Sequence, residues 1–161
     1  MPVDLSTLLR RDHLDLERAL ADLARPRQAR RELSDTLDGV RLGLIAHAEA
    51  EDIVFSQVLA TLPTTSPLHL LLARMRADHL EQERALSALV VSRPGTPTWR
   101  DRADQLRALI AEHARDTEQQ LTILKNDIPA HLAGAFATER MRQLAMIQPS
   151  APIVSYAELA G

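Results

Sequence analysis

Hydrophobic residues along the chain recur at alternating steps of three and four, which is the spacing of one face of an α-helix. Ala, Leu, Arg, Glu and Gln dominate these stretches, and none of them shows the apolar–polar alternation of a β-strand. Proline-containing segments at 24–29, 61–67 and 92–98 interrupt the pattern, because a helix rarely continues through proline. The pattern therefore predicts helices near 5–24, 31–61, 67–91 and 99–127, and a shorter one at about 130–146.

Each of the four long segments has one apolar stripe, which is typical of an all-α, antiparallel up-down four-helix bundle. We expect this bundle to occupy residues 1–128, since a chain of 161 residues is long enough for one core. Residues 129–161 are expected to add a short C-terminal helix and an extended tail, packed on the same domain. Thr98, three residues before Asp101, is the expected N-cap of the fourth helix.

One histidine interrupts each apolar stripe, and the spacing of these histidines is regular. They are His13, His47, His79 and His113, separated by 34, 32 and 34 residues. Two residues of an antiparallel hairpin lie at the same height when they are equally far from the turn. The midpoints of successive pairs fall within or next to the three breaks, so we expect the four imidazoles to share one layer inside the bundle. His69 and His131 fall outside this layer and are expected at the surface or at helix ends.

The first and third helices also share a repeated segment. Residues 12–23 read DHLDLERALADL and residues 78–89 read DHLEQERALSAL, with eight of twelve positions identical. The same offset of 66 residues relates His47 to His113. The repeat predicts two helix pairs related by a pseudo-twofold axis.

A metal site explains the predicted histidine layer better than a purely hydrogen-bonded polar core, which is the alternative. A buried polar group without a partner costs roughly 1–3 kcal/mol, and crowded buried imidazoles resist protonation. Coordination satisfies all of them together. Imidazole and carboxylate ligands without sulfur suit iron, and also manganese or zinc. Four histidines exceed the needs of one tetrahedral zinc ion beside two acids, which favours two metal ions.

Helical spacing selects the candidate carboxylates. Glu51 lies one turn after His47 on the same face. Thr117 occupies the matching position on the fourth helix, flanked by Asp116 and Glu118. We expect Glu118 to supply the second carboxylate, with Asp116 as the alternative.

Two further acids, Glu17 and Glu83, each lie one turn after a histidine. They are candidates for metal ligands, for groups that orient the imidazoles, or for ordinary surface residues.

The composition excludes several other classes of protein. The chain has no cysteine, which removes disulfides and thiolate metal sites. Its net charge of −3 and its aromatic content of 2% argue against a nucleic-acid surface. The N-terminal residues lack a basic segment followed by a long apolar run. We therefore expect a cytoplasmic protein without a membrane or nucleic-acid partner, as a monomer or weak homodimer.

The combined pattern resembles the hemerythrin-like (HHE cation-binding) family over residues 5–127. The resemblance lies in one histidine on the first helix, H-x-x-x-E on the second, one histidine on the third, and a histidine with an acid on the fourth. The segments RRDHLDLERAL and LIAHAEAEDIVF carry it most closely. It implies an up-down four-helix bundle around a non-haem diiron centre with an oxo or hydroxo bridge. Carried over, His13 and His47 would bind one iron, His79 and His113 the other, and Glu51 and Glu118 would bridge them.

The chain departs from the oxygen-carrying members of that family. They have a fifth histidine on the third helix, whereas Met75 and Glu83 stand one turn before and after His79 here. Thr117 also replaces the acid of the H-x-x-x-E motif that is frequent on the fourth helix. The implied ligands would leave about two positions of two six-coordinate irons open to small molecules.

The resemblance to small actinobacterial hemerythrin-like proteins implies reaction with hydrogen peroxide, as a catalase-like diiron oxidoreductase. Glu83 is then the candidate acid–base group. The alternative is a protein that binds or senses oxygen, nitric oxide or iron without turnover. A metal-free helical interaction module is a third possibility, which the histidine layer disfavours.

Overall fold

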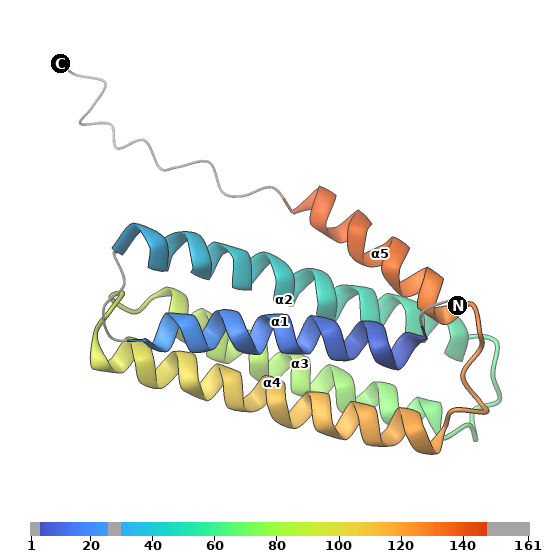
Figure 1. Cartoon of the computed structure of the whole chain (residues 1–161). Helices are drawn as coiled ribbons and strands as arrows, with labels where there is room; N and C mark the ends of the chain where they lie inside the picture. Colours follow the sequence, from blue (N-terminus) through green and yellow to red (C-terminus); the bar gives the residue numbers. More distant parts are fainter. Residues whose placement is uncertain (1–3, 26–29, 148–161) are drawn as a thin grey trace.

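The computed structural model describes residues 4–25 and 30–147, and this part of the chain contains five helices and no strand (Figure 1). The helices are α1 (Leu5–Ala24), α2 (Arg30–Leu59), α3 (Leu68–Val90), α4 (Pro97–Ile123) and α5 (Leu132–Met146). Every helix that the hydrophobic pattern predicts is present, and the ends differ by a few residues. The expected C-terminal tail after residue 147 lies outside the described residues.

Helices α1 to α4 run alternately in opposite directions and form a four-sided bundle (Figure 1). Both α1 and α3 pack against α2 and α4, while the backbones of the described helices on opposite corners stay apart and only side chains meet between them. Helix α5 turns back along the bundle and packs on α2 and α1. The fold is therefore the all-α hemerythrin-like bundle expected from the sequence, with one added C-terminal helix.

The start of α4 corrects the expected N-cap. The cap residue is Thr96, whose hydroxyl accepts a hydrogen bond of 3.2 Å from the Trp99 N–H, and Pro97 takes the first helical position. Thr98 already lies inside the helix. The reason is that proline fits the first turn of a helix, where its missing N–H is not needed, so the helix begins before Thr98.

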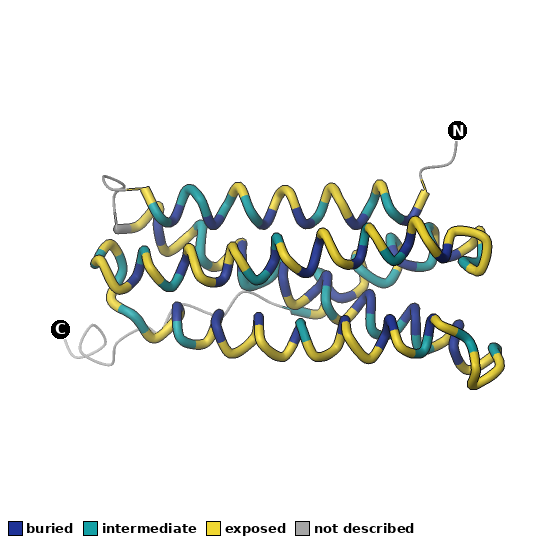
Figure 2. The backbone as a smooth tube through the Cα atoms, turned by 90° about the horizontal axis from the view of Figure 1, so that it is seen from below, coloured by how far each residue is buried: buried dark blue, intermediate teal, exposed yellow. Residues whose placement is uncertain are grey.

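Buried positions recur along the whole length of the bundle helices (Figure 2). The apolar ones form two clusters, one toward each end of the bundle. Along α1, Leu9 belongs to one cluster and Leu16 to the other, and His13 lies between them. Helix α5 contributes Phe136 to the cluster that contains Leu9. Trp99 anchors the opposite cluster, and its indole N–H donates a hydrogen bond of 3.3 Å to the Leu23 carbonyl. The histidine layer is thus enclosed by apolar side chains on both sides.

Among the described residues, none of the helices combines the length and the apolar character that a membrane crossing requires.

Candidate metal centre

The four histidines of the apolar stripes meet in one layer of the bundle, as their spacing predicts. All four are buried, and the most accessible, His79, is 8% exposed. The two shortest distances between ring centroids are 4.5 Å for His13–His47 and 4.8 Å for His79–His113. The distance is 5.2 Å for His13–His113, 6.3 Å for His47–His79 and 6.4 Å for His47–His113. The rings therefore group as two adjacent pairs.

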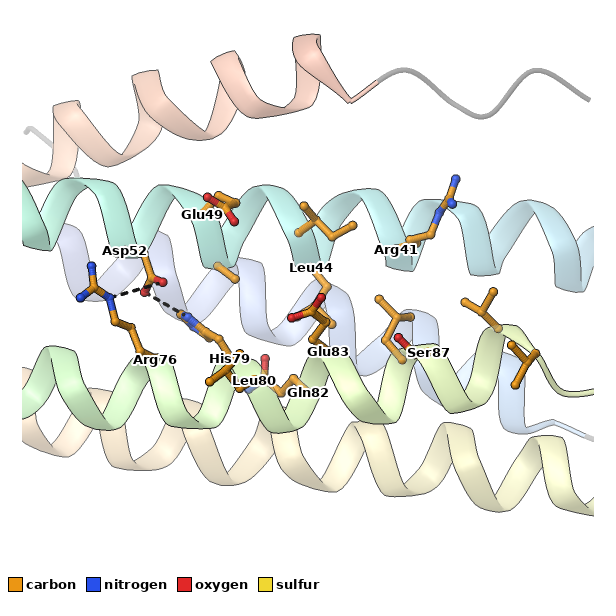
Figure 3. Close-up of a pocket in the computed structure, with 15 residues that line it drawn as sticks. Arg41, Leu44, Glu49, Asp52, Arg76, His79, Leu80, Gln82, Glu83 and Ser87 are labelled. Atoms are coloured by element: carbon orange, nitrogen blue, oxygen red, sulfur yellow. Dashed lines mark ion pairs between the residues drawn. The ribbon is translucent and has the colours of Figure 1, made fainter.

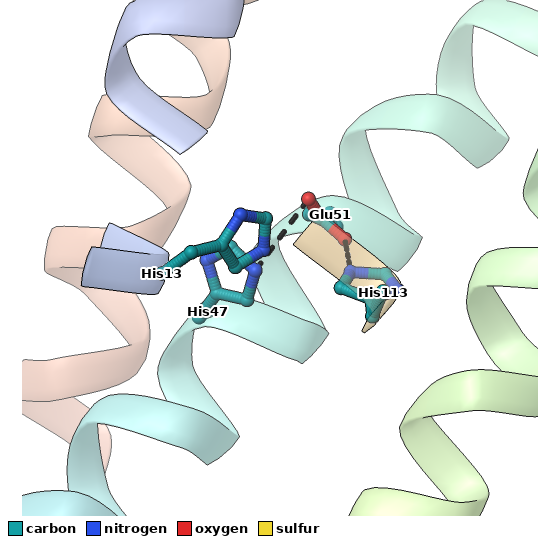
Figure 4. Close-up of side chains that lie close together, drawn as sticks. All are labelled: His13, His47, Glu51 and His113. Atoms are coloured by element: carbon teal, nitrogen blue, oxygen red, sulfur yellow. Dashed lines mark ion pairs between the residues drawn. The ribbon is translucent and has the colours of Figure 1, made fainter. Parts of the chain in front are cut away.

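Glu51 is the fully buried carboxylate of this layer, and α2 places it one turn after His47 (Figure 4). Its Oε1 lies 3.5 Å from Nε2 of His47. Its Oε2 lies 3.1 Å from Nε2 of His79 and 3.4 Å from Nε2 of His113. The two oxygens thus face different histidine pairs, which is the arrangement that a carboxylate needs in order to bridge two cations.

Three of the four imidazoles also have an aspartate beside Nδ1. The pairs and their Nδ1–oxygen distances are His47–Asp12 at 3.3 Å, His79–Asp52 at 3.3 Å and His113–Asp78 at 3.1 Å. A carboxylate at this position favours the tautomer that carries its proton on Nδ1, which leaves Nε2 as the free donor atom. In all three residues Nε2 is the nitrogen that faces Glu51.

Sequence reasoning did not assign these aspartates, although the repeat contains a signal for two of them. Asp12 and Asp78 are the first residues of the two copies. Each contacts a histidine 35 residues later, on the following helix. The repeat therefore encodes an aspartate–histidine contact between neighbouring helices in addition to an apolar stripe. Asp52 directly follows Glu51 in the sequence and carries no comparable signal.

His13 differs from the other three histidines. Neither of its ring nitrogens has a hydrogen-bond partner. Burial, and after it the neighbouring imidazole of His47, lower the pKa of His13 to about 3. His13 is therefore a neutral imidazole at ordinary pH.

Glu118, the expected second carboxylate, lies outside the layer. Its two oxygens bind the Arg10 guanidinium, with distances of 3.2 Å from Nε to Oε1 and 2.8 Å from NH2 to Oε2, and its side chain is 29% exposed. The physical reason is helix geometry: each residue turns by about 100°, so the position five after His113 points away from the interior. Thr117 is buried at the inward position instead, and the alternative, Asp116, is exposed.

The internal repeat gives a second reason why Glu118 lies outside the layer. An offset of 66 residues places Glu118 in register with Asp52, and Thr117 in register with Glu51. Position 118 therefore corresponds to an aspartate at the outer edge of the layer. Glu51 is the carboxylate that the described residues bring into the centre of the layer.

The remaining sequence candidates lie away from the layer. Glu17 is half-buried and borders a shallow surface depression that also includes Glu118. His69 is half-buried near the start of α3, with its Nε2 3.1 Å from the Pro63 carbonyl oxygen. His131 is exposed immediately before α5. These positions agree with the surface and helix-end roles expected for the two histidines.

A groove of about 650 Å³ runs between α2 and α3 and reaches the layer at His79 (Figure 3). Apolar side chains that include Leu44, Leu80 and Leu86 line it. Glu83, the candidate acid–base group, is exposed and also lines this groove. The groove gives small molecules an approach to one histidine of the layer.

The charges in the layer support one another. Burial alone would raise the pKa of Glu51, but the imidazoles of His47, His113 and His79 outweigh burial and hold this pKa well below its ordinary value. For His79, burial would lower the pKa, and the nearby carboxylates of Asp52 and Glu51 outweigh it and raise the pKa to about 9. Without a metal ion, Glu51 is an anion and His79 carries a proton.

The donor atoms of the layer fit a cation. Several buried nitrogen and oxygen atoms of the layer have no hydrogen-bond partner, namely Nδ1 and Nε2 of both His13 and His79, Nε2 of His47 and His113, and both carboxylate oxygens of Glu51. His13, His47, Glu51 and His113 each offer one ligand atom, and these atoms lie within 4.8 Å of one another. A bound cation would satisfy at once the polar groups that hydrogen bonds leave unpaired.

Comparison with protein families agrees with this site. The model of the hemerythrin HHE cation-binding domain matches residues 4–122, which include all four histidines and Glu51. Neither a curated protein nor a solved structure matches the chain. Helix α5 lies beyond the matched segment.

Proposed function

Because the chain belongs to the hemerythrin HHE cation-binding family, we propose that its buried site binds two iron ions and that the iron-loaded protein decomposes hydrogen peroxide. The observation that carries the proposal is the position of Glu51 between two histidine pairs, with a groove leading to His79. Nitrogen and oxygen donors without sulfur suit iron.

The division of the layer into two halves supports two ions over one. One oxygen of Glu51 faces His47, whose ring is closest to His13, and the other faces His79 and His113. Because Glu51 is the central carboxylate among the described residues, we propose an oxo or hydroxo group as the second bridge. The compact group of His13, His47, Glu51 and His113 is the competing site for a single ion. Metal content separates the two, because the proposal requires about two irons per chain.

The proposed reaction balances without an external reductant. One peroxide molecule gives up two electrons and two protons and becomes dioxygen, and a second takes them up and becomes two molecules of water. Two iron ions, when bound, supply the redox couple that carries the two electrons between the two peroxide molecules. The protein contributes the approach through the groove between α2 and α3. The apolar clusters close the layer toward both ends of the bundle.

We assign the proton transfer at the groove to Glu83. This carboxylate lines the same groove as His79 and is exposed, so it can exchange protons with solvent. A positioned carboxylate of this kind takes a proton from the substrate in one half of the reaction and returns it in the other.

The apolar lining of the groove favours a second candidate function. Side chains such as Leu44, Leu80 and Leu86 suit an uncharged diatomic molecule. The alternative to peroxide decomposition is therefore a protein that binds or senses oxygen or nitric oxide without turnover. A protein that only binds iron would also belong to this alternative.

An oxygen electrode decides between these functions. Iron-loaded protein mixed with hydrogen peroxide should release one dioxygen for every two peroxide molecules consumed, at a rate above that of an equal concentration of free iron. Release no faster than free iron, together with a reversible oxygen or nitric oxide adduct of the reduced protein, would establish the alternative.

A pair of variants tests the role of Glu83 in proton transfer. Glu83→Gln should lower the rate of oxygen release by about 10²-fold or more, while iron content stays unchanged. Glu81→Gln is the matched control, because Glu81 is exposed on the same helix and does not line the groove. Equal rates in the two variants would remove Glu83 from the mechanism.

A further inference from the structure

Helix α5 contacts the histidine layer although it lies outside the segment that matches the family. Two of its side chains make the contact. The Phe136 ring packs edge-on against the His47 ring, with a centroid distance of 5.8 Å. The Arg140 guanidinium Nε donates a hydrogen bond to Oδ2 of Asp12, and the same oxygen lies beside Nδ1 of His47.

We propose that Arg140 is a positioning residue that acts through Asp12 on His47 and raises the reduction potential of the bound iron. This inference rests on one part of the proposed function, the binding of iron, and does not depend on peroxide decomposition. It makes α5 a functional part of the site rather than an appendage of the bundle.

The physical effect follows from the shared oxygen. A carboxylate beside the Nδ1–H of a metal-binding histidine increases the electron donation of Nε2. An arginine that binds the same carboxylate oxygen withdraws part of that negative charge, so His47 donates less. Weaker donation from His47 favours the reduced, less positive state of the metal. The Asp12 side chain is only 13% exposed, so solvent screens this contact incompletely.

The other half of the layer provides an internal comparison. Asp78 lies beside His113 as Asp12 lies beside His47, but the Asp78 side chain is 40% exposed to solvent, whereas that of Asp12 is 13% exposed and binds Arg140. The repeat therefore makes two similar aspartate–histidine pairs, and α5 makes them unequal. We expect Nε2 of the two histidines to differ in electron donation to a bound metal for this reason.

The first test uses metal-free protein and the imidazole ¹⁵N resonances. Arg140→Gln should shift the Nδ1 resonance of His47 and leave that of His113 in place. Arg142→Gln is the matched control, since Arg142 lies on the same helix and pairs with Glu139 at the surface. An unchanged His47 resonance in Arg140→Gln, in protein that retains its helical content, would overturn the proposed connection.

The second test measures the reduction potential of the iron-loaded protein. Arg140→Gln should lower it by an amount equal to about a tenfold increase in the preference for ferric over ferrous iron, which is about 59 mV for a one-electron couple. Arg140→Lys keeps the charge and should restore most of the potential. Equal potentials in Arg140→Gln and Arg142→Gln would contradict the proposal, whatever the peroxide activity of either protein.

A double-mutant cycle tests whether Arg140 acts through Asp12. If it does, Arg140→Gln should have little further effect on the potential in a protein that already carries Asp12→Asn. Full additivity of the two changes would show that Arg140 acts independently of Asp12 and would refute this route. The cycle also covers the case in which Arg140→Gln loosens α5, because loss of packing at α5 would lower the melting temperature in both backgrounds.

Discussion

Nε2 of His79 lies 3.1 Å from a carboxylate oxygen of Glu51, so helices α2 and α3 meet at a buried charged contact. Glu51 also faces His47 and His113. One carboxylate therefore connects histidines from three helices, and the stability of the metal-free layer depends on it. When a cation binds, the same carboxylate becomes available as a ligand.

Glu51→Ala should abolish most of the metal binding. The substitution removes the buried anion that faces both histidine pairs and leaves the imidazoles without a compensating charge. Metal content after reconstitution and desalting measures the effect. Glu17→Ala is the control, because Glu17 borders a surface depression away from the layer. Equal metal content in the two variants would mean that Glu51 is not a ligand.

Asp78→Asn should weaken metal binding by about 10–100-fold, the usual range for a residue that orients a histidine ligand. The amide can still accept a hydrogen bond from His113 but no longer increases the electron donation of the imidazole. Competition with a chelator of known affinity measures the change. Asp104→Asn, which affects a surface pair with Arg107, should leave the affinity unchanged. An affinity equal to that of the unaltered protein would show that the His113–Asp78 contact does not support the metal.

Glu118→Gln should change metal affinity by less than about twofold, because an exposed ion pair to Arg10 contributes little to a site from which it is separated. The melting temperature should also change little, since the Arg10 side chain is 63% exposed. Metal titration followed by optical absorption checks the first point. Loss of the metal in this variant would return Glu118 to the centre as a ligand, after release from Arg10.

His13→Leu should make the metal-free protein less sensitive to acid. The pKa of His13 is about 3 in the folded protein against an ordinary value of 6.5. As the pH falls below 6.5, the unfolded chain takes up a proton at this residue and the folded chain does not. His13 therefore reduces the free energy of unfolding progressively, by up to about 1.4 kcal/mol per pH unit.

Comparing the unaltered protein with His13→Leu isolates the contribution of His13 to the pH dependence of stability. His79 and His113 have raised pKa values, so their effect is opposite: the stability that they provide is complete below pH 6.5 and is lost as the pH rises through their folded values. Urea denaturation in the presence of a chelator, between pH 7 and pH 5, should show the stability of His13→Leu relative to the unaltered protein increasing as the pH falls. Parallel curves would contradict a neutral buried His13.

The positions of the helices and of the histidine layer follow from the sequence because they depend on regular geometry. Residues at equal distances from a turn meet in an antiparallel hairpin, and this argument requires only the breaks and a constant rise per residue. The spacing in the sequence also indicates which acid lies away from the layer: the position of Glu118, five residues after His113, points outward, and Thr117 holds the inward position.

The contacts that surround the layer were less predictable for a different reason. The contact of Asp12 with His47 and the contact of Asp12 with Arg140 both join different helices. The contact of Asp12 with His47 has a signal in the sequence, because Asp12 and Asp78 occupy the same position in the two copies of the repeat. The contact between Asp12 and Arg140 depends on how α5 packs on α1 and α2. Because α5 has no counterpart in the repeat, no regular residue offset predicts this contact.

The candidate metal ligands come from all four helices of the bundle, and this affects the order of helix assembly and metal binding. Helices α1, α3 and α4 each bring one donor side chain to the layer, and α2 brings two. A nascent chain that lacks any one of the four helices cannot complete the set, and no pair of neighbouring helices holds more than three of the five donors. We therefore expect tight metal binding only after the four helices have assembled, so that the metal stabilises a completed bundle and does not direct its assembly.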